Sequence, residues 1–402
     1  MEKRYTRQQR HRKLYKLAWL MNKQNKQLVP ISKELIDCFE IAMADDEIDF
    51  LLKMGTHERD YTELCSLSGL SSADFKKFFE TIFSKGFIKA TRTKGDVEKF
   101  ILHPIMVGWF EMYLAGGKET EDRKEFSRRV DIYFKSFKKF NFFPLRSLVN
   151  LNRRLITTNS SIAAIAPGKR IKSTRSIEIG VNVPTPLSEV QSVKSVNDLI
   201  ETYADEGIAL MHCFCRQWRK MVDQPCGFQQ SAEACIGIGG MARYLVQSGI
   251  GRSISKTEAM DKLQETEEKG AVHLVYHERD DARLPAIGIC NCCKDCCAIF
   301  GSYNRGIFPL AFKTHAYSEV FDALGCKACG QCLKYCPVNA IVMKADMVII
   351  NSAKCIGCGQ CVFRCKQNVI KLVPGEREVI LPLLKASDVT IANDAHSRRV
   401  SL

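Results

Sequence analysis

Eight cysteines near the C-terminal end of the chain fall into two runs with the same internal spacing. The runs are "GCKACGQCLKYCPVNAIVM", residues 325–343, and "KCIGCGQCVFRCKQNVIKLV", residues 354–373. A shift of 29 residues superimposes the two sets of cysteines. The sets are Cys326, Cys329, Cys332 and Cys336, then Cys355, Cys358, Cys361 and Cys365. Disulfides need only pairs of thiols, so a repeated fourfold spacing favours a metal group held by four thiolates.

A cubane iron–sulfur cluster takes four thiolate ligands, of which a C-x-x-C-x-x-C loop offers three and a distant cysteine the fourth. The segment of residues 320–373 resembles the bacterial two-cluster ferredoxin, in which the last cysteine of each run binds the opposite cluster. The resemblance implies two 4Fe–4S clusters with crossed ligand sets. One set is Cys326, Cys329, Cys332 and Cys365, and the other is Cys355, Cys358, Cys361 and Cys336. Lys366 stands where that family usually has proline, which weakens one turn and removes no ligand.

The alternative for these runs is a pair of structural zinc sites, which usually use two C-x-x-C knuckles rather than triple runs. The chain has 402 residues and 19 cysteines, and 17 of the cysteines lie within residues 213–365. No long uninterrupted apolar run occurs, so we expect no transmembrane helix, and the basic start lacks the features of a secretory signal. We therefore expect a cytoplasmic protein whose thiols stay reduced and bind metal.

Nine further cysteines lie upstream of the repeat, more than a small domain needs for packing. They are Cys213, Cys215, Cys226, Cys235, Cys290, Cys292, Cys293, Cys296 and Cys297. We expect them to bind metal, and a further iron–sulfur cluster is favoured over zinc, with redox-active thiols as a third interpretation. The sequence does not indicate which four belong together.

The expected fold class is α+β multidomain, with a winged-helix-like N-terminal unit, a cysteine-rich α/β middle unit and a ferredoxin-like two-cluster domain. The expected segments are a basic arm, the winged-helix-like domain, a charged helical and irregular connector, the cysteine-rich domain, the ferredoxin domain and a C-terminal tail. In that order they span residues 1–27, 28–118, 119–175, 176–310, 311–373 and 374–402.

The winged-helix expectation comes from helix, turn and helix followed by two β-prone runs. Its second helix places Phe75, Phe78, Phe79, Ile82 and Phe83 on one face. On the other face we expect a mixed set of exposed charges that lacks the side chains used to read base edges. That set is Asp74, Lys76, Lys77, Glu80 and Lys85. The arm, with nine Lys or Arg in residues 1–26, could supply phosphate contacts, but a protein-docking module is favoured.

The glycine run "GIGGMA", residues 237–242, fits a loose dinucleotide fingerprint. No clear β-run is expected before it, so a turn beside a metal site is the favoured interpretation.

Four segments lie upstream of the repeat: "MHCFCRQW", "ACIGIG", "GRSISKTEAMDKLQETEEKGAVH" and "ICNCCKDCC". Together they are similar to a loosely characterised group of ferredoxin-domain proteins with an N-terminal helix–turn–helix-like segment. The resemblance, over most of residues 28–373, implies a cytoplasmic electron-transfer component of an oxidoreductase system that works with redox partner proteins. The alternative function is a redox- or iron-responsive DNA-binding regulator, so nucleic acid is the less favoured partner. Whether the protein is an enzyme stays open, and an electron-transfer subunit is favoured over a stand-alone catalyst.

Overall fold

The computed structural model describes residues 5–24, 29–91, 98–138, 160–162, 196–277, 286–307 and 309–384. The chain divides into two compact units, each made of segments that are separate in sequence. The first unit comprises Met1–Phe137, Glu206–Cys226 and Ala232–Ser255, and the second comprises Lys138–Asp205, Gly227–Ser231 and Lys256–Leu402. Helices and several sheets occur together, consistent with the expected α+β class. No helix within the described ranges is long and apolar enough to cross a membrane.

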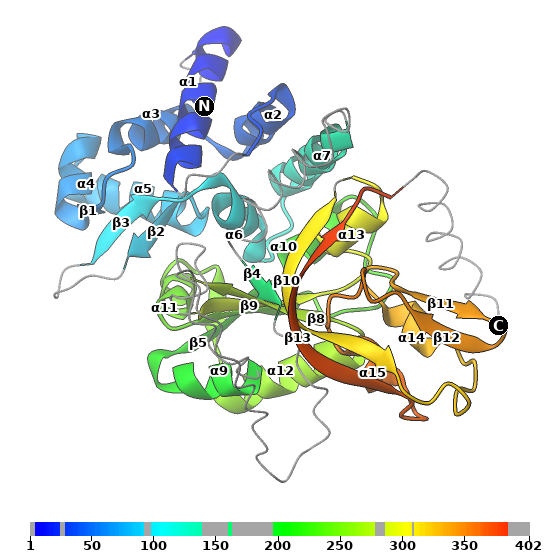
Figure 1. Ribbon diagram of the computed structural model, residues 1–402. Helices are drawn as coiled ribbons and strands as arrows, with labels where there is room; N and C mark the ends of the chain where they lie inside the picture. Colours follow the sequence, from blue (N-terminus) through cyan, green and yellow to red (C-terminus); the bar gives the residue numbers. More distant parts are fainter. Residues whose placement is uncertain are drawn as a thin grey trace, which may run out of the picture. The chain divides into compact units, whose positions relative to one another are not determined.

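Helices dominate the N-terminal part of the first unit (Figure 1). They are α1 (Arg7–Gln24), α2 (Lys33–Ala42), α3 (Asp45–Met54), α4 (Tyr61–Ser68), α5 (Ser72–Ser84), the π-helical turn η1 (Ile105–Trp109), α6 (Phe110–Ala115) and α7 (Glu121–Ser136). The short strands β1 (Arg59–Asp60), β2 (Ile88–Thr91) and β3 (Lys99–Leu102) form an antiparallel sheet in the order β1-β3-β2. Helix, turn, helix and hairpin thus follow one another as the sequence predicts, and a winged-helix role stays a prediction.

The apolar face of α5 is buried as its helical period predicts. Phe75, Phe79, Ile82 and Phe83 are all buried, and Phe79 packs edge-on against Phe100 of β3 with ring centroids 4.9 Å apart. The expected exposure of Lys85 is wrong. Its Nζ lies 2.7 Å from a carboxylate oxygen of the buried Glu47, because α3 places that carboxylate beside the end of α5.

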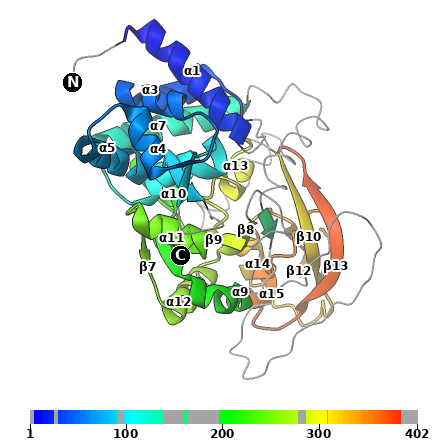
Figure 2. The ribbon, with the colours of Figure 1, turned by 90° about the vertical axis from the view of Figure 1, so that its left-hand side faces the viewer.

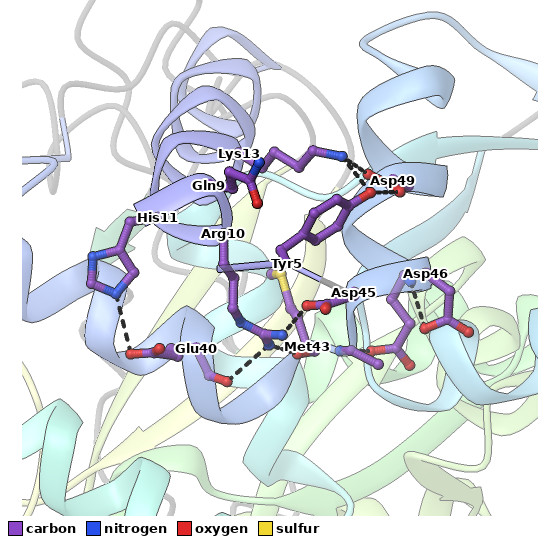
Figure 3. Close-up of polar contacts among 12 residues, drawn as sticks. Tyr5, Gln9, Arg10, His11, Lys13, Glu40, Met43, Asp45, Asp46 and Asp49 are labelled. Atoms are coloured by element: carbon purple, nitrogen blue, oxygen red, sulfur yellow. Dashed lines mark hydrogen bonds and ion pairs between the residues drawn. The ribbon is translucent and has the colours of Figure 1, made fainter. Parts of the chain in front are cut away.

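Helix α1 is joined to α2 and α3 through its basic side chains (Figure 3). Arg10 pairs with Asp45, Lys13 pairs with Asp49, and His11 Nε2 lies 3.3 Å from Glu40. The next turns of the same face bury Leu14, Leu17, Ala18 and Met21 completely. Part of the basic arm is therefore a packed helix whose charges are partly compensated within the protein.

The first unit also contains β5 (Ile208–His212), α10 (Phe214–Met221), β6 (Glu233–Ile238), α11 (Gly240–Gln247) and β7 (Gly251–Ser253). Strand β5 lies between β6 and β7 and is antiparallel to both. Strand β6 leads into the glycine run and includes its first two residues, Gly237 and Ile238, so the expectation of no β-run before it is wrong. Gly237 has no room for a side chain against Leu245 of α11, which explains a glycine there without a nucleotide.

The second unit begins with three antiparallel strands. They are β4 (Ser160–Ile162), β8 (Val272–His277) and β9 (Ala286–Cys292), with β8 in the middle. Helices α9 (Val196–Tyr203) and α12 (Lys256–Glu268) lie beside each other, and the short turn η4 (Ala204–Glu206) follows α9. Ser255 and Glu258 predict a capping box for a helix that ends near Gly270, and α12 ends there, with a φ of +90° at Gly270. The run "RSIEIGVNVPTP", residues 175–186, predicts a strand, but it lies outside the described residues.

A long two-stranded ribbon supports the cysteine repeat (Figures 1 and 2). It pairs β10 (Leu310–Val320) with β13 (Ile370–Leu381), so residues 374–381 of the expected tail continue a strand. Between these strands in sequence lie α14 (Gln331–Tyr335), the hairpin of β11 (Ile341–Lys344) and β12 (Met347–Ile350), and α15 (Gln360–Arg364). The short helix α13 (Phe300–Asn304) precedes the ribbon.

Candidate iron–sulfur site

The 29-residue repeat of the sequence is also a repeat of backbone conformation. Helices α14 and α15 each follow a left-handed glycine, Gly330 at φ 68° and Gly359 at φ 73°. Each helix has five residues and ends at a cysteine in extended conformation, Cys336 or Cys365. The two helices therefore offer their cysteines in the same way.

Two further pairs of equivalent positions share positive φ angles. Ala328 and Gly357 have φ of 50° and 66°, and Asn339 and Asn368 have φ of 52° and 53°. Left-handed residues next to right-handed ones turn successive N–H groups into one concavity, a nest that binds anions such as iron–sulfur clusters. A side chain at Gly357 would overlap the carbonyl of Ala316, so only glycine fits there.

The turn after the second run forms although proline is absent. The N–H of Asn368 donates to the carbonyl of Cys365 at 3.0 Å, and Asn339 makes the equivalent bond to Cys336 at 3.5 Å. Asparagine tolerates the left-handed conformation that this turn needs. Lys366 is therefore compatible with the same turn as Pro337.

One group of thiols surrounds Cys332. Burial raises its pKa to about 11, and the charges of Cys329, Cys365 and Cys326 add to the shift because they lie close by. The last cysteine of the second run thus lies with the first three of the first run.

The other group surrounds Cys358 and Cys361. Burial raises the pKa of Cys358 well above its usual range, and the charges of Cys336 and Cys361 raise it further. Burial also raises the pKa of Cys361 to about 12. The hydrogen bond between Cys361 and Ser318 lowers the pKa, and the charges of Cys336 and Cys355 raise it. Cys361 is also close to Cys332, so the two groups are neighbours. Four thiolates together are stable only beside a cation, so each donor set fits a metal centre.

Backbone N–H groups donate hydrogen bonds to cysteine sulfurs, and one of them comes from β10, outside the two runs. The N–H of Ser318 on β10 donates to Cys355 Sγ at 3.3 Å, and Ser318 Oγ lies 3.1 Å from Cys361 Sγ. The N–H of Ala340 donates to Cys336 Sγ at 3.2 Å. Such bonds stabilise thiolates and adjust the reduction potential of a cluster. The spacing of the cysteines gives no signal for Ser318.

The two thiol groups differ in exposure. In the group of Cys332, Cys329 is exposed and Cys326 and Cys365 are half-buried. In the other group Cys336, Cys355 and Cys361 are buried and only Cys358 is half-buried. The loop of the second run is covered by the rest of its unit, since Gln360 is buried and its Nε2 donates to the carbonyl of Ala271 at 2.6 Å. Its equivalent, Gln331, is exposed.

The nine upstream cysteines are divided between the two units. The first unit contains Cys213, Cys215, Cys226 and Cys235, and the second contains Cys290, Cys292, Cys293, Cys296 and Cys297. In the first unit Cys213 directly precedes α10 and lies within hydrogen-bonding reach of Cys215 and Cys235. These bonds lower the pKa of Cys213 well below its usual range although the residue is buried. The cysteine spacing does not predict that these three thiols lie together, because their proximity depends on the pairing of β5 with β6.

Paired groups of four thiols on a repeated backbone with anion-binding nests define an iron–sulfur class of site. Residues 318–366 match the family model of the 4Fe-4S dicluster domain. That match supports iron–sulfur clusters as the cofactor and electron transfer as the broad function. No curated protein and no solved structure gives a significant match to the chain.

Proposed function

We propose that this protein transfers single electrons through two 4Fe–4S clusters as a ferredoxin-type component of a cytoplasmic oxidoreductase system. The observation that carries the proposal is the repeat of helix, left-handed residues and terminal cysteine in α14 and α15. When bound, each cluster supplies a centre that accepts or donates one electron. The match of residues 318–366 to the dicluster domain supports the same function.

We assign the thiols to two crossed sites. The outer site uses Cys326, Cys329, Cys332 and Cys365, and the inner site uses Cys336, Cys355, Cys358 and Cys361. The proximity of Cys332 to Cys365, and of Cys358 to Cys336, supports this assignment. The nests would hold the anionic clusters, and Ser318 and Ala340 would donate hydrogen bonds to the inner ligands.

The outer site is the place where electrons are exchanged with a partner protein. Its Cys329 is exposed, and two large apolar side chains nearby in sequence, Phe321 and Leu324, are 57% and 93% exposed. Apolar side chains beside an exposed ligand are suited to a brief contact with another redox protein. The buried inner site would then hold the electron away from solvent.

The proposal is tested by anaerobic purification with counts of iron and acid-labile sulfide, followed by paramagnetic resonance of the dithionite-reduced protein. We expect at least about eight irons per chain, which is four for each cluster, and signals from two interacting centres. Stoichiometric zinc without iron would contradict it.

A redox- or iron-responsive DNA-binding regulator is the second candidate. The order α4, turn, α5, β2 and β3 supports it, because a helix–turn–helix with a hairpin is a DNA-binding arrangement. The internal pairing of Arg10 and Lys13 leaves fewer charges for phosphates, so we favour protein docking for residues 28–118. Weak, salt-sensitive and sequence-independent DNA binding is expected. A discrete genomic site whose footprint responds to oxidation would favour the regulator.

A further inference from the structure

Five cysteines outside the ferredoxin repeat lie at the end of β9 and in the turn that follows. Along a strand, side chains alternate between faces, so Cys290 and Cys292 share one face and Asn291 takes the other. Cys292 lies within hydrogen-bonding reach of both Cys290 and Cys297. Three thiols from one short segment thus meet at one place.

Two of these three thiols are buried, and two more cysteines lie next to them in sequence. Cys292 and Cys297 are 7% and 3% exposed, and the Sγ atoms of Cys293 and Cys296 are 2.9 Å apart. A buried cysteine packs as a small apolar residue, but thiol-to-thiol contacts among several cysteines are what a metal centre requires. The segment therefore offers several thiol donors to a centre separate from the ferredoxin sites.

The turn that carries these cysteines is joined through Asn304 to the turn that follows Cys336. Asn304, at the end of α13, is 8% exposed and donates from Nδ2 to the carbonyls of Lys294 and Pro337, each at 3.0 Å. Its Oδ1 accepts from Asn339 at 2.8 Å. Lys294 follows Cys293, and Pro337 follows Cys336, a ligand proposed for the inner site. One buried amide thus joins the two cysteine-bearing turns.

Packing and electrostatic contacts also place the turn after β9 close to the inner site. Cys292 and Cys297 belong to one continuous buried cluster with Cys336, Cys355 and Cys361. The side chain of Lys294 lies close enough to Cys336 to interact electrostatically with it. A redox centre held by these thiols would therefore be next to the inner site, with protein and no bulk solvent between them.

We propose that Cys290, Cys292 and Cys297 supply three of the four ligand positions of a third iron–sulfur cluster, which exchanges single electrons with the inner ferredoxin site. The exchange rests on the proposed function, whereas the metal site itself does not. One electron leaves one cluster as it enters the other, no atom is transferred, and a redox partner protein supplies or removes the electron. Asn304 is a positioning residue that fixes the two turns relative to each other. A zinc ion is redox-inert, so at this position it could not exchange electrons with the inner site.

The test uses the full-length protein isolated anaerobically, with Cys292→Ser combined with Cys297→Ser, and Cys65→Ser in α4 of the other unit as the control. We expect about twelve irons per chain in the unchanged protein and in the control, and about eight in the double variant, with the ferredoxin signals retained. About eight irons in all three would overturn the third cluster and leave the proposed function intact. One zinc that disappears in the double variant would overturn it too, and no iron in any of them would overturn both.

A second variant separates positioning from mere folding. Asn304→Asp keeps the shape and the acceptor but removes both donated hydrogen bonds, and Asn351→Asp adds the same charge at an exposed position. We expect an unchanged iron count in both, with a shifted midpoint potential and weaker spin coupling for the inner cluster only in Asn304→Asp. Identical potentials and spectra in the two variants would overturn the role of Asn304.

Discussion

The guanidinium carbon of Arg364 lies 3.9 Å from the centre of the Tyr335 ring, and the two residues occupy equivalent positions in the 29-residue repeat. Each is the last residue of its helix, directly before the cysteine that ends it. Arg364 also donates to the carbonyls of Glu267, at 2.8 Å, and Glu268. The contact therefore joins α14 to α15 and both to α12.

Replacing Arg364 by alanine removes a cation–π contact and two charge-assisted hydrogen bonds. We expect the free energy of unfolding to fall by about 2 kcal/mol. Arg364→Lys should recover part of the loss, since it keeps the charge without the planar fork. Lys366→Ala, at a nearby exposed position, should change stability by less than about 0.5 kcal/mol. Thermal unfolding of the anaerobic protein compares the three variants, and equal midpoints would contradict the structural role of the stacked pair.

Cys336→Ser and Cys365→Ser should each remove the cluster of the opposite run. Because the outer ligands are more exposed, the cluster that remains in Cys336→Ser should bleach rapidly with an iron chelator. The cluster that remains in Cys365→Ser should bleach slowly. Absorbance decay in the two variants measures this difference. The reverse order of rates would show that the ligand sets are not crossed.

Lys294→Met should make the midpoint potential of the inner cluster more negative. A positive charge near Cys336 stabilises the more negative, reduced cluster, so its removal disfavours reduction. We expect a shift on the order of tens of millivolts from the loss of one half-buried charge. Lys327→Met, an exposed change beside the outer ligands, should leave the inner potential unchanged. Potentiometric titration followed by paramagnetic resonance measures both, and equal shifts would contradict the placement of Lys294.

Glu267 should make stability depend on pH. Burial raises its pKa to about 7, although the nearby positive charge of Arg364 lowers it. The folded state therefore holds this proton more tightly than the unfolded state, and stability falls as pH rises from about 4.5 to about 7. Glu267→Gln should remove that loss of stability. Above pH 7 its free energy of unfolding should exceed that of the unchanged protein by at most about 3 kcal/mol.

Thermal midpoints between pH 5 and pH 8 check this prediction. Glu268→Gln, on the exposed side of the same helix, is the matched control. Parallel curves for Glu267→Gln and the unchanged protein would show that Glu267 does not titrate in this range.

Local spacing predicted the elements whose causes are local. The fourfold cysteine runs, the apolar face of α5 and the end of α12 near Gly270 all follow from short periods and turn residues. Contacts between distant segments were not predictable in this way. Lys85 was expected to be exposed, but Glu47, distant in sequence, pairs with it.

The candidate site also combines residues that the sequence predicts with residues that it does not. Its eight repeat cysteines are readable from the sequence. Ser318, Lys294 and Asn304 carry no spacing signal, and they reach the site from β10, from the turn after β9 and from α13. The unequal exposure of the two runs is also invisible in the repeat, because only the second run is covered by Ala271 and its neighbours.

With crossed ligand sets, each short helix carries one ligand for each cluster, Cys332 and Cys336 on α14 and at its end, and Cys361 and Cys365 on α15 and at its end. Neither half of the repeat can then bind a complete cluster while the other half is unfolded. Assembly of either cluster would therefore need both helices to be folded. Loss of the outer cluster to oxygen would release Cys365 at the end of α15, the helix that also carries the inner ligand Cys361, so damage at the surface would weaken the binding of the cluster that remains.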